Sequence, residues 1–399
     1  MPKADFNNSN AVRMFGNSTY SRQLLTSIVN NEKVVGVNPA WFLTQGSINP
    51  TLTPMDEHGL ATFTVYERSL DADPLASLRA PLGDAETMDF AGVNSYAASI
   101  PDFNTRKFVI SAPMRKDWER SFAMLGSDAA ILKEMWGPNV QRQIRQMQST
   151  MNWMTAQLMT TGKFVYGKIG SDRVGGFYSP IHKADIPAAN FVKAGSVAWT
   201  DQSAKIITCM QTIEGNFRER TAYDGAMVWQ FTKKFFLNVF IKNAEVLEKV
   251  NEFRNLQDLI SVTFNNINTD VFNNAWENVR AAYGLSRIEI VEEKEFVENK
   301  ETGEMKAVNG WADNIAVLRP AGDAVRFMRK GILDEEYADM LNSATQRNFA
   351  PIYNGLGTLV NSTVAEGIYN SWQTVVLFSA VPALVEFTHH VIVDTSKAG

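Results

Sequence analysis

The sequence lacks most of the residues on which common enzyme and metal sites depend. Its 399 residues include one cysteine, Cys209, and four histidines. One cysteine excludes an intramolecular disulfide and any cluster of several thiolate ligands. No G-x-S-x-G, H-E-x-x-H, Walker or G-x-G-x-x-G motif occurs, so the usual signatures of hydrolases, metalloproteases and nucleotide-binding enzymes are missing. We therefore expect no catalytic residue, no metal ligand and no cofactor.

The polar residues that remain do not suggest such a site either. His389 and His390 are adjacent in a predicted strand, so we expect them to point to opposite faces and not to share one ion. The acidic run at 334–336 is typical of a solvated helix start. Cys209 is typical of a small buried hydrophobic residue.

The chain also has little excess charge and no long apolar run. Its 38 Lys and Arg residues against 43 Asp and Glu residues provide no basic surface for sequence-specific nucleic-acid binding. No apolar run approaches the roughly 18 residues that cross a bilayer. The first residues lack the apolar core of a secretory signal. We expect a folded protein that is made in the cytoplasm and does not contact a membrane.

Two segments near the N-terminus have too few apolar residues to form a core of their own. Residues 1–50 are rich in Asn, Ser and Thr, and we interpret them as an arm. Within 51–115, two β-rich segments at 59–70 and 105–114 flank a loop of Asp, Pro and Gly, which predicts a two-stranded ribbon with an extended tip. Such a ribbon is marginally stable alone, so we expect it to order against other chains. The candidate inter-subunit contacts of this loop are Glu67, Arg68 and Arg79.

A long helical region follows the loop. A first helix is predicted over 117–136, and Gly137 and Pro138 are expected to end it. Pro138 is expected to stand in the first turn of a second helix, where its missing N–H costs nothing, and Gly162 is expected to close that helix in the left-handed conformation. Apolar residues recur along the second helix at alternating spacings of four and three. This pattern predicts one packing seam formed by Val140, Ile144, Met147, Met151, Met154 and Leu158.

The methionines of this seam are expected to fill a core, since their flexible side chains adapt to irregular surfaces. A seam between two copies in a coiled coil is the alternative. The opposite face of the helix carries the polar residues Gln141, Arg142, Arg145, Gln148, Ser149 and Asn152.

The rest of the chain mixes helical and strand patterns, which indicates an α+β protein. The segment 223–253 fits either a strand or a helix with one apolar face. The other predicted elements are a helix over 269–284, a hairpin over 287–308, a strand over 314–322, a helix near 323–341, and strands over 374–380 and 383–395.

Three stretches resemble the lambda-type major capsid proteins of tailed bacteriophages. The segment 287–322, which ends in WADNIAVLRPAG, resembles the penultimate segment of that family. The helix end TAQLMTTGKFVY at 155–166 resembles the end of the family's spine helix. The segment 225–251 resembles the stretch between its central segments. The order of an arm, a ribbon, a long helix, a mixed lobe and C-terminal strands is similar as well.

This resemblance implies the HK-97-like capsid fold and a structural protein that is not an enzyme. The implied parts are an N-terminal arm (1–50), an extended β-ribbon loop (51–115), a peripheral domain with the spine helix (116–200), a mixed α/β axial domain (201–370) and C-terminal strands that return to the peripheral domain (371–399).

The resemblance further implies self-assembly as hexamers and pentamers into an icosahedral shell. This virion shell would be assembled in the host cytoplasm and would enclose double-stranded DNA through non-specific contacts. The implied partners are a scaffolding protein, a portal and decoration proteins. Two alternatives remain open: a shell protein of a cellular compartment with the same fold, and a soluble enzyme with an unrecognised site.

Overall fold

The computed structural model describes most of the chain from residue 41 onward. The described residues are 41–56, 61–68, 93–105, 107–111, 114, 117, 128–165, 181–252, 269–291, 295–298, 305–308, 310–331, 348–352, 355–366 and 369–399. Most of the predicted arm, the tip of the predicted loop with Arg79, and the acidic run at 334–336 lie outside these residues.

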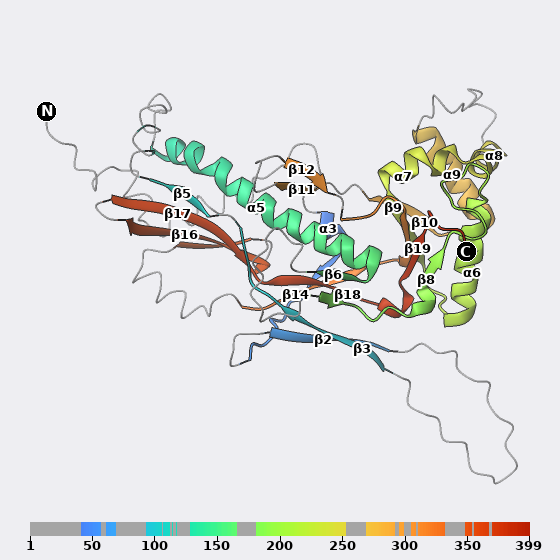
Figure 1. Ribbon diagram of the computed structural model, residues 1–399, viewed down its shortest axis with the longest axis horizontal. Coiled ribbons are helices and arrows are strands. Elements are labelled where there is room, and N and C mark those ends of the chain that lie inside the picture. The colour runs from blue at the N-terminus through green and yellow to red at the C-terminus, as the bar shows by residue number, and fades with distance from the viewer. Residues whose placement is uncertain are drawn as a thin grey trace, which may run out of the picture.

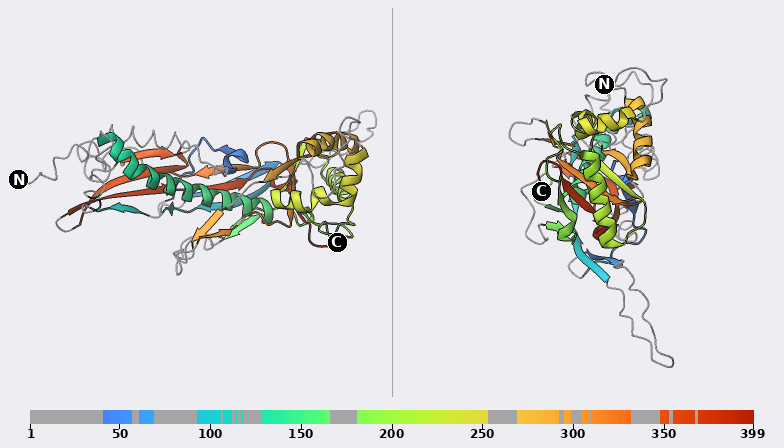
Figure 2. Two further views of the ribbon diagram at one scale, coloured as in Figure 1. Left: turned by 90° about the horizontal axis from the view of Figure 1, so that it is seen from above. Right: turned by 90° about the vertical axis from the view of Figure 1, so that its right-hand side faces the viewer.

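The body is elongated, with one long helix along its length and a group of shorter helices at one end (Figure 1, Figure 2). Its buried apolar side chains form two clusters. We call them the first core, which contains the buried residues of the long helix α5 (Asp128–Thr161), and the second core, which lies beneath the shorter helices. The α+β class predicted from the sequence is confirmed.

Helix α5 continues through Pro138, so the prediction that Gly137 and Pro138 separate two helices is wrong. A proline inside a helix removes one backbone hydrogen bond and costs about 3 kcal/mol. From Val140 onward α5 is anchored in the first core, and tertiary packing of this kind outweighs a local cost. At the far end Gly162 has φ 69° and donates its N–H to the Leu158 carbonyl, so the predicted left-handed end is confirmed.

The first core packs α5 against two sheets and a short N-terminal helix. These elements are α3 (Trp41–Thr44), β1 (Gly46–Ile48), β4 (Phe103–Asn104), β5 (Phe108–Ile110), β14 (Val325–Arg329), β15 (Asn348–Ile352), β16 (Gly357–Glu366), β17 (Tyr369–Phe378) and β18 (Ala380–Leu384). One sheet has the order β15-β16-β17-β4, with β5 also paired to β17. The other has the order β1-β14-β18, in which β1 and β14 are parallel. Helix α5 packs on β17 and β18 (Figure 1).

Strand β14 lies where the sequence predicted a helix near 323–341, and for these residues that prediction is wrong. Val325 and Phe327 are buried while Arg326 between them is exposed. This alternation belongs to a strand with one buried face. The charged residues after it made the whole segment look like an amphipathic helix.

The predicted ribbon exists, but its second strand is not the predicted one. Strands β2 (Ala61–Arg68) and β3 (Val93–Ile100) pair antiparallel along their whole length. The segment 105–114 instead supplies β5 to the sheet of the first core. Strand β3 reads VNSYAASI, whose small and polar residues gave little strand signal. In the right-hand view of Figure 2, the blue and cyan ribbon strands lie at the lower edge of the body.

The second core lies between one face of a mixed sheet and the shorter helices. The sheet has the order β10-β9-β13-β19-β8. Its strands are β8 (Phe191–Lys193), β9 (Met227–Thr232), β10 (Arg287–Val291), β13 (Ile315–Pro320) and β19 (Val391–Asp394), and its helices are α6 (Ile206–Thr221), α7 (Lys233–Asn238), α8 (Ala244–Glu252) and α9 (Thr269–Tyr283). The segment 223–253, which fitted a strand or a helix, contains both in succession: β9, then α7 and α8. The predicted helix over 269–284 and the strand ending at Pro320 are confirmed as α9 and β13.

Two short strand pairs complete the described elements. Strands β11 (Glu295–Glu298) and β12 (Met305–Val308) form a hairpin, so the later part of the hairpin predicted over 287–308 is confirmed. Strand β10, at its start, instead joins the sheet beside β9. Strands β6 (Lys163–Val165) and β7 (Ile181–Lys183) pair just after α5.

The C-terminal segment serves both cores. Strands β17 and β18 pack along α5, whereas β19 joins the sheet of the second core. The single strand predicted over 383–395 is wrong, because the short 3₁₀ helix η7 (Phe387–His389) separates β18 from β19. The domain boundaries suggested by the sequence stay predictions. Among the described residues, no helix has both the length and the apolar character needed to cross a membrane.

Candidate functional site

The seam of α5 lies inside the first core. Val140, Ile144, Met147, Met151, Met154 and Leu158 are all buried. Their neighbours come from strands that are far away in sequence, as Gly357 of β16 illustrates. A Cβ atom added to Gly357 would lie 2.7 Å from the Met147 sulfur, so helix and strand approach closely here. The seam ties the N-terminal half of the chain to its C-terminal strands.

The opposite, polar face of α5 is also partly buried, which the sequence did not reveal. The Asn152 side-chain oxygen accepts a hydrogen bond of 2.9 Å from the backbone N–H of Phe42 in α3. Beside the seam itself, the Gln143 amide donates to the Thr374 carbonyl of β17 at 2.7 Å. Arg142 and Arg145 remain exposed. Chain segments therefore cover α5 on more than one side. Polar side chains of α5 form hydrogen bonds with backbone groups of these covering segments.

The ribbon has one face toward the body and one toward solvent. The inward side chains Ala61, Phe63 and Glu67 of β2, and Tyr96 and Ile100 of β3, are buried. On the outward face Tyr66 is 72% exposed and Val93 is 61% exposed. Tyr66 and Val93 are diagonal neighbours on this face, and aromatic side chains such as tyrosine are enriched where surfaces meet a partner. This outward face is the strongest candidate for an assembly contact among the described residues.

The loop end of the paired ribbon strands is attached to the body through Glu67, the penultimate residue of β2. Its carboxylate accepts hydrogen bonds from the Thr388 N–H at 2.8 Å, from the Thr388 hydroxyl at 2.5 Å and from His389 Nδ1 at 2.7 Å. Glu67 was predicted as an inter-subunit contact, but it is buried and its carboxylate is used within the chain. That prediction is corrected here: Glu67 positions the ribbon. Arg68 lies at the end of β2, and its role and that of Arg79 stay predictions.

A second attachment is aromatic. His182 of β7 is buried and stacks on Phe164, with ring centroids 4.6 Å apart. Phe63 and Tyr96 of the ribbon lie 6.0 and 6.3 Å from the same imidazole. The Tyr96 hydroxyl also donates to the Leu384 carbonyl at 3.0 Å, and burial raises the pKa of that phenol. Burial lowers the pKa of His182 to about 3, so this histidine is neutral.

The two adjacent C-terminal histidines have separate partners. They lie in and after η7 rather than in a strand, so the reason given from the sequence for separating them is wrong. His389 faces Glu67, whereas His390 Nε2 bonds to the Met159 carbonyl near the end of α5 at 2.6 Å. Burial lowers the pKa of His390 to about 4. Among the described residues, no group of His, Cys, Asp and Glu side chains is arranged to hold a metal ion.

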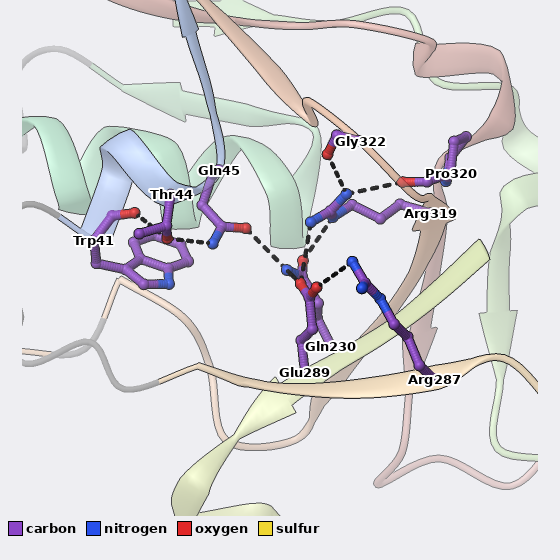
Figure 3. Close-up of polar contacts among 9 residues, drawn as sticks. All are labelled: Trp41, Thr44, Gln45, Gln230, Arg287, Glu289, Arg319, Pro320 and Gly322. Carbon is purple, nitrogen blue, oxygen red and sulfur yellow. Dashed lines mark hydrogen bonds and ion pairs between the residues drawn. The ribbon is translucent and has the colours of Figure 1, made fainter. Parts of the chain in front are cut away.

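A buried polar network joins the N-terminal segment to the sheet of the second core (Figure 3). The Gln230 amide donates to the Gln45 side-chain oxygen at 2.9 Å and to Glu289 at 3.0 Å. Arg319 donates to the Gln230 oxygen at 3.0 Å and lies 3.3 Å from Glu289. Gln45 directly follows α3, so it connects α5 and its neighbours to β9, β10 and β13.

Arg319 is the charged centre of this network. Its guanidinium also donates to the Pro320 and Gly322 carbonyls, both at 2.8 Å (Figure 3). Burial lowers the pKa of Arg319, and the nearby Glu289 carboxylate opposes that effect. A buried, well-satisfied network of this kind favours one relative arrangement of the parts that it connects. No sequence motif pointed to it, because its members are scattered from residue 45 to residue 322.

Cys209 is half-buried rather than fully buried. Its thiol donates to the Ala194 carbonyl at 3.0 Å, and burial raises its pKa. A thiol with a raised pKa is a poor nucleophile at neutral pH. Its surroundings are therefore those of a structural residue.

The fold is similar to that of phage capsid proteins. The capsid asymmetric unit of cyanophage A-1(L) aligns over 92% of this chain and 95% of that chain, with a TM-score of 0.50 and 10% identity. A phage-related protein from Bordetella bronchiseptica RB50 covers 94% and 96% of the two chains, with a TM-score of 0.45 and 12% identity. The putative capsid protein of a prophage of E. coli CFT073 covers 97% and 98%, with a TM-score of 0.42 and 12% identity.

The cyanophage alignment confirms, at the level of the fold, the resemblance to phage capsid proteins that the sequence suggested. No protein-family model matches the sequence. No curated protein matches it either.

Proposed function

We propose that this chain is the major capsid protein of a tailed bacteriophage. Its copies assemble as hexamers and pentamers into an icosahedral head that encloses double-stranded DNA, and its role is structural rather than catalytic. A phage capsid fold over nearly the whole chain supports this proposal. The parts follow an HK-97-like plan, with an extended loop, a spine helix in a peripheral domain and an axial domain.

The observation that carries the proposal is the ribbon β2–β3. Its inward face is packed on the body, while its outward face exposes Tyr66 and Val93. A two-stranded ribbon gains little stability from its own contacts, so two exposed apolar side chains on an otherwise largely polar face suit a contact with a neighbouring subunit. Each copy that extends a ribbon onto the next one forms a head-to-tail contact, and such contacts form a ring when the rotation between copies closes.

The rest of the molecule fits the needs of a shell wall. Helix α5 has 34 residues, which corresponds to about 50 Å at 1.5 Å per residue, and it is anchored on several sides. An element of that length and burial keeps the wall segment straight while contacts form at its edges. Arg142 and Arg145, exposed on α5, are candidates for non-specific contact with DNA phosphates.

The proposal includes partners beyond the chain itself. Assembly in the host cytoplasm would involve a scaffolding protein, a portal occupies one vertex of the mature head, and decoration proteins bind its outside. These partners follow from the assignment as a phage head protein. The mature location of the chain would be the virion.

The outward face of the ribbon provides the test. In the double variant Tyr66→Asp and Val93→Asp, two charges replace apolar contacts at exposed positions. We expect the protomer to unfold at the same temperature as the parent chain, because both side chains are exposed. Particle formation, measured by light scattering and sedimentation, should be lost.

The matched control is the double variant Tyr66→Phe and Val93→Ile. It keeps an apolar side chain at both positions and should assemble as the parent does. Normal particles from the charged variant would contradict the role of this face. Particles that exclude nucleic acid and enclose a protein cargo would instead identify a compartment shell.

A further inference from the structure

The ribbon strands β2 and β3 are attached to the body at two places, and each place contains a buried histidine. At the first, Glu67 of β2 contacts Thr388 and His389. At the second, Phe63 and Tyr96 pack around His182. All these side chains are on the inward face, so lifting the ribbon would expose both histidines together.

The Glu67 attachment is a buried ion-pair geometry. Glu67 Oε1 and His389 Nδ1 are 2.7 Å apart, and both side chains are almost fully buried. Because a carboxylate only accepts, the imidazole nitrogen is the donor. Removing one partner of such a pair leaves the other buried and unsatisfied, which costs more than the pair contributes. We therefore expect Glu67 and His389 to stay paired or to separate and become solvated together.

The His182 attachment depends on the opposite condition, an uncharged ring. The imidazole lies among the rings of Phe164, Phe63 and Tyr96, of which two belong to the ribbon. An aromatic enclosure of this kind removes water from the ring, and a cation without water is strongly disfavoured there. A charged His182 is compatible with the structure only after the ribbon has moved away.

We propose that these two contacts form an acid-sensitive clasp, in which protonation of His182 releases the ribbon strands, with the first-core side chains that they carry, while the second core stays folded. The clasp depends on contacts within the chain and is independent of the proposed assembly. In a shell it would determine when the ribbon can change its position relative to a neighbour.

The direction of the pH effect follows from the burial of His182. Burial lowers its pKa to about 3 in the closed state, whereas an exposed imidazole titrates near 6.5. The open state therefore binds the proton more tightly. The closed state keeps its full advantage above about pH 6.5 and loses it progressively as the pH falls toward 3.

Among the described residues, the following charged groups lie around the clasp. On β7 itself, Lys183 and Asp185 pair with each other at 3.6 Å and are exposed. Lys163 of β6 lies opposite Lys183 and is exposed. The groups that face or approach His389 are Glu67 of the ribbon, Glu386 before η7 and Tyr223 after α6. The carbonyl of Tyr223 accepts a hydrogen bond from Arg218.

The test is amide hydrogen exchange on the full chain in its unassembled form, measured between pH 7.5 and about pH 5 and corrected for intrinsic rates. For one histidine with these pKa values, opening of the ribbon should increase about 30-fold at pH 5. Amides in β2 and β3 should show this increase, while amides of β9 and β13 in the second sheet keep their protection.

Two variants identify the residues responsible. His182→Phe keeps an aromatic ring but has no titrating group, so ribbon exchange should lose most of its pH dependence. Glu67→Gln should increase ribbon exchange severalfold already at pH 7.5, with the second sheet unchanged. His390→Gln is the matched control, since His390 contacts Met159 rather than the ribbon and should leave the ribbon's pH dependence intact.

The proposal is overturned if β2 and β3 lose protection only together with β9 and β13, because the ribbon would then not open separately. It is equally overturned if His182→Phe retains the full pH dependence. Neither result depends on whether the chain forms particles, so failure of the clasp and failure of the shell assignment are distinguishable.

Discussion

The two cores of this molecule are built in different ways. The first joins segments from opposite ends of the chain: β1 pairs with β14, and residues 46–48 lie beside 325–327. The second is formed largely within residues 191–291, with β13 and β19 added. Methionines line α5 in the first core, whereas in the second the ring of Phe231 lies 5.4 Å from those of Phe235 and Phe240.

This difference indicates a division of tasks along the body. Methionine side chains adjust to irregular neighbours, so the first core tolerates small shifts of the sheets that lie on α5. Aromatic rings pack in specific relative orientations, as the 85° angle between Phe240 and Trp276 illustrates. The first core also contains oriented ring pairs, such as Phe42 and Phe327 at 86°. We infer that its methionine seam along α5 is the more adaptable region, whereas the ring cluster of the second core is more rigid.

The largest expected effect comes from placing a charge in the methionine seam of the first core. Met151→Asp would bury a carboxylate in the middle of the seam, where Met151 has no exposed surface. We expect a loss of more than about 4 kcal/mol in the free energy of unfolding, enough to prevent folding of most of the chain. Solubility and urea denaturation measure the loss.

Arg142→Asp is the matched control on the exposed face of the same helix and should change stability by no more than about 0.5 kcal/mol. A soluble Met151→Asp variant of normal stability would mean that the seam does not lie in a core.

A smaller but still large effect should follow from separating the distant strands. A Cβ atom on Gly46 would lie 1.7 Å from the Val325 carbonyl oxygen, so Gly46→Ala is incompatible with the β1–β14 pairing. We expect a cost of about 3 kcal/mol, similar to other cases of overpacking. Thermal unfolding with fluorescence detection provides the measurement.

Gly215→Ala supplies the comparison in the helix α6 of the second core, where an added Cβ meets no atom within 4 Å. This variant should be more stable than the parent by about 0.5–1 kcal/mol, because alanine favours a helix. Equal effects of the two alanines would contradict the close strand approach at Gly46.

The smallest effect separates the two kinds of core most finely. Met154→Leu replaces a flexible side chain by one of similar volume and should cost less than about 1 kcal/mol. Phe240→Leu removes a ring that contacts Phe231, Phe236 and Trp276, and should cost about 2 kcal/mol. Urea denaturation of both variants compares them directly, and a larger cost at Met154 would reverse our view of the two cores.

Periodic patterns in the sequence predicted the elements whose signal is local. The seam residues 140–158, helix α9 and strand β13 each show a regular apolar spacing that matches the structure. The helix break at Pro138 was predicted wrongly, and so was the helix near 323–341 for the residues that form β14, because burial in the first core overrides the local preference in both places. Strand β3 was missed since its pairing partner β2, rather than its own composition, makes it a strand.

The attachment of the ribbon could not be predicted from the sequence in the same way. Glu67 and Thr388 are separated by 321 positions, and each alone resembles an ordinary surface residue. The same holds for Gln45 and Gln230, which meet only because β1 and β9 belong to parts that pack together. Contacts of this kind depend on the tertiary fold, so no local spacing encodes them.

The most direct test of the central claim is the size of what the chain forms. The full chain is expressed once alone and once together with a candidate scaffolding protein. The two soluble fractions are compared by light scattering and negative-stain microscopy. The account predicts hexamers, tubes or closed shells tens of nanometres across. Helix α5 alone makes each subunit about 5 nm long or more. A monomer or dimer under every one of these conditions would contradict the assignment as a shell protein.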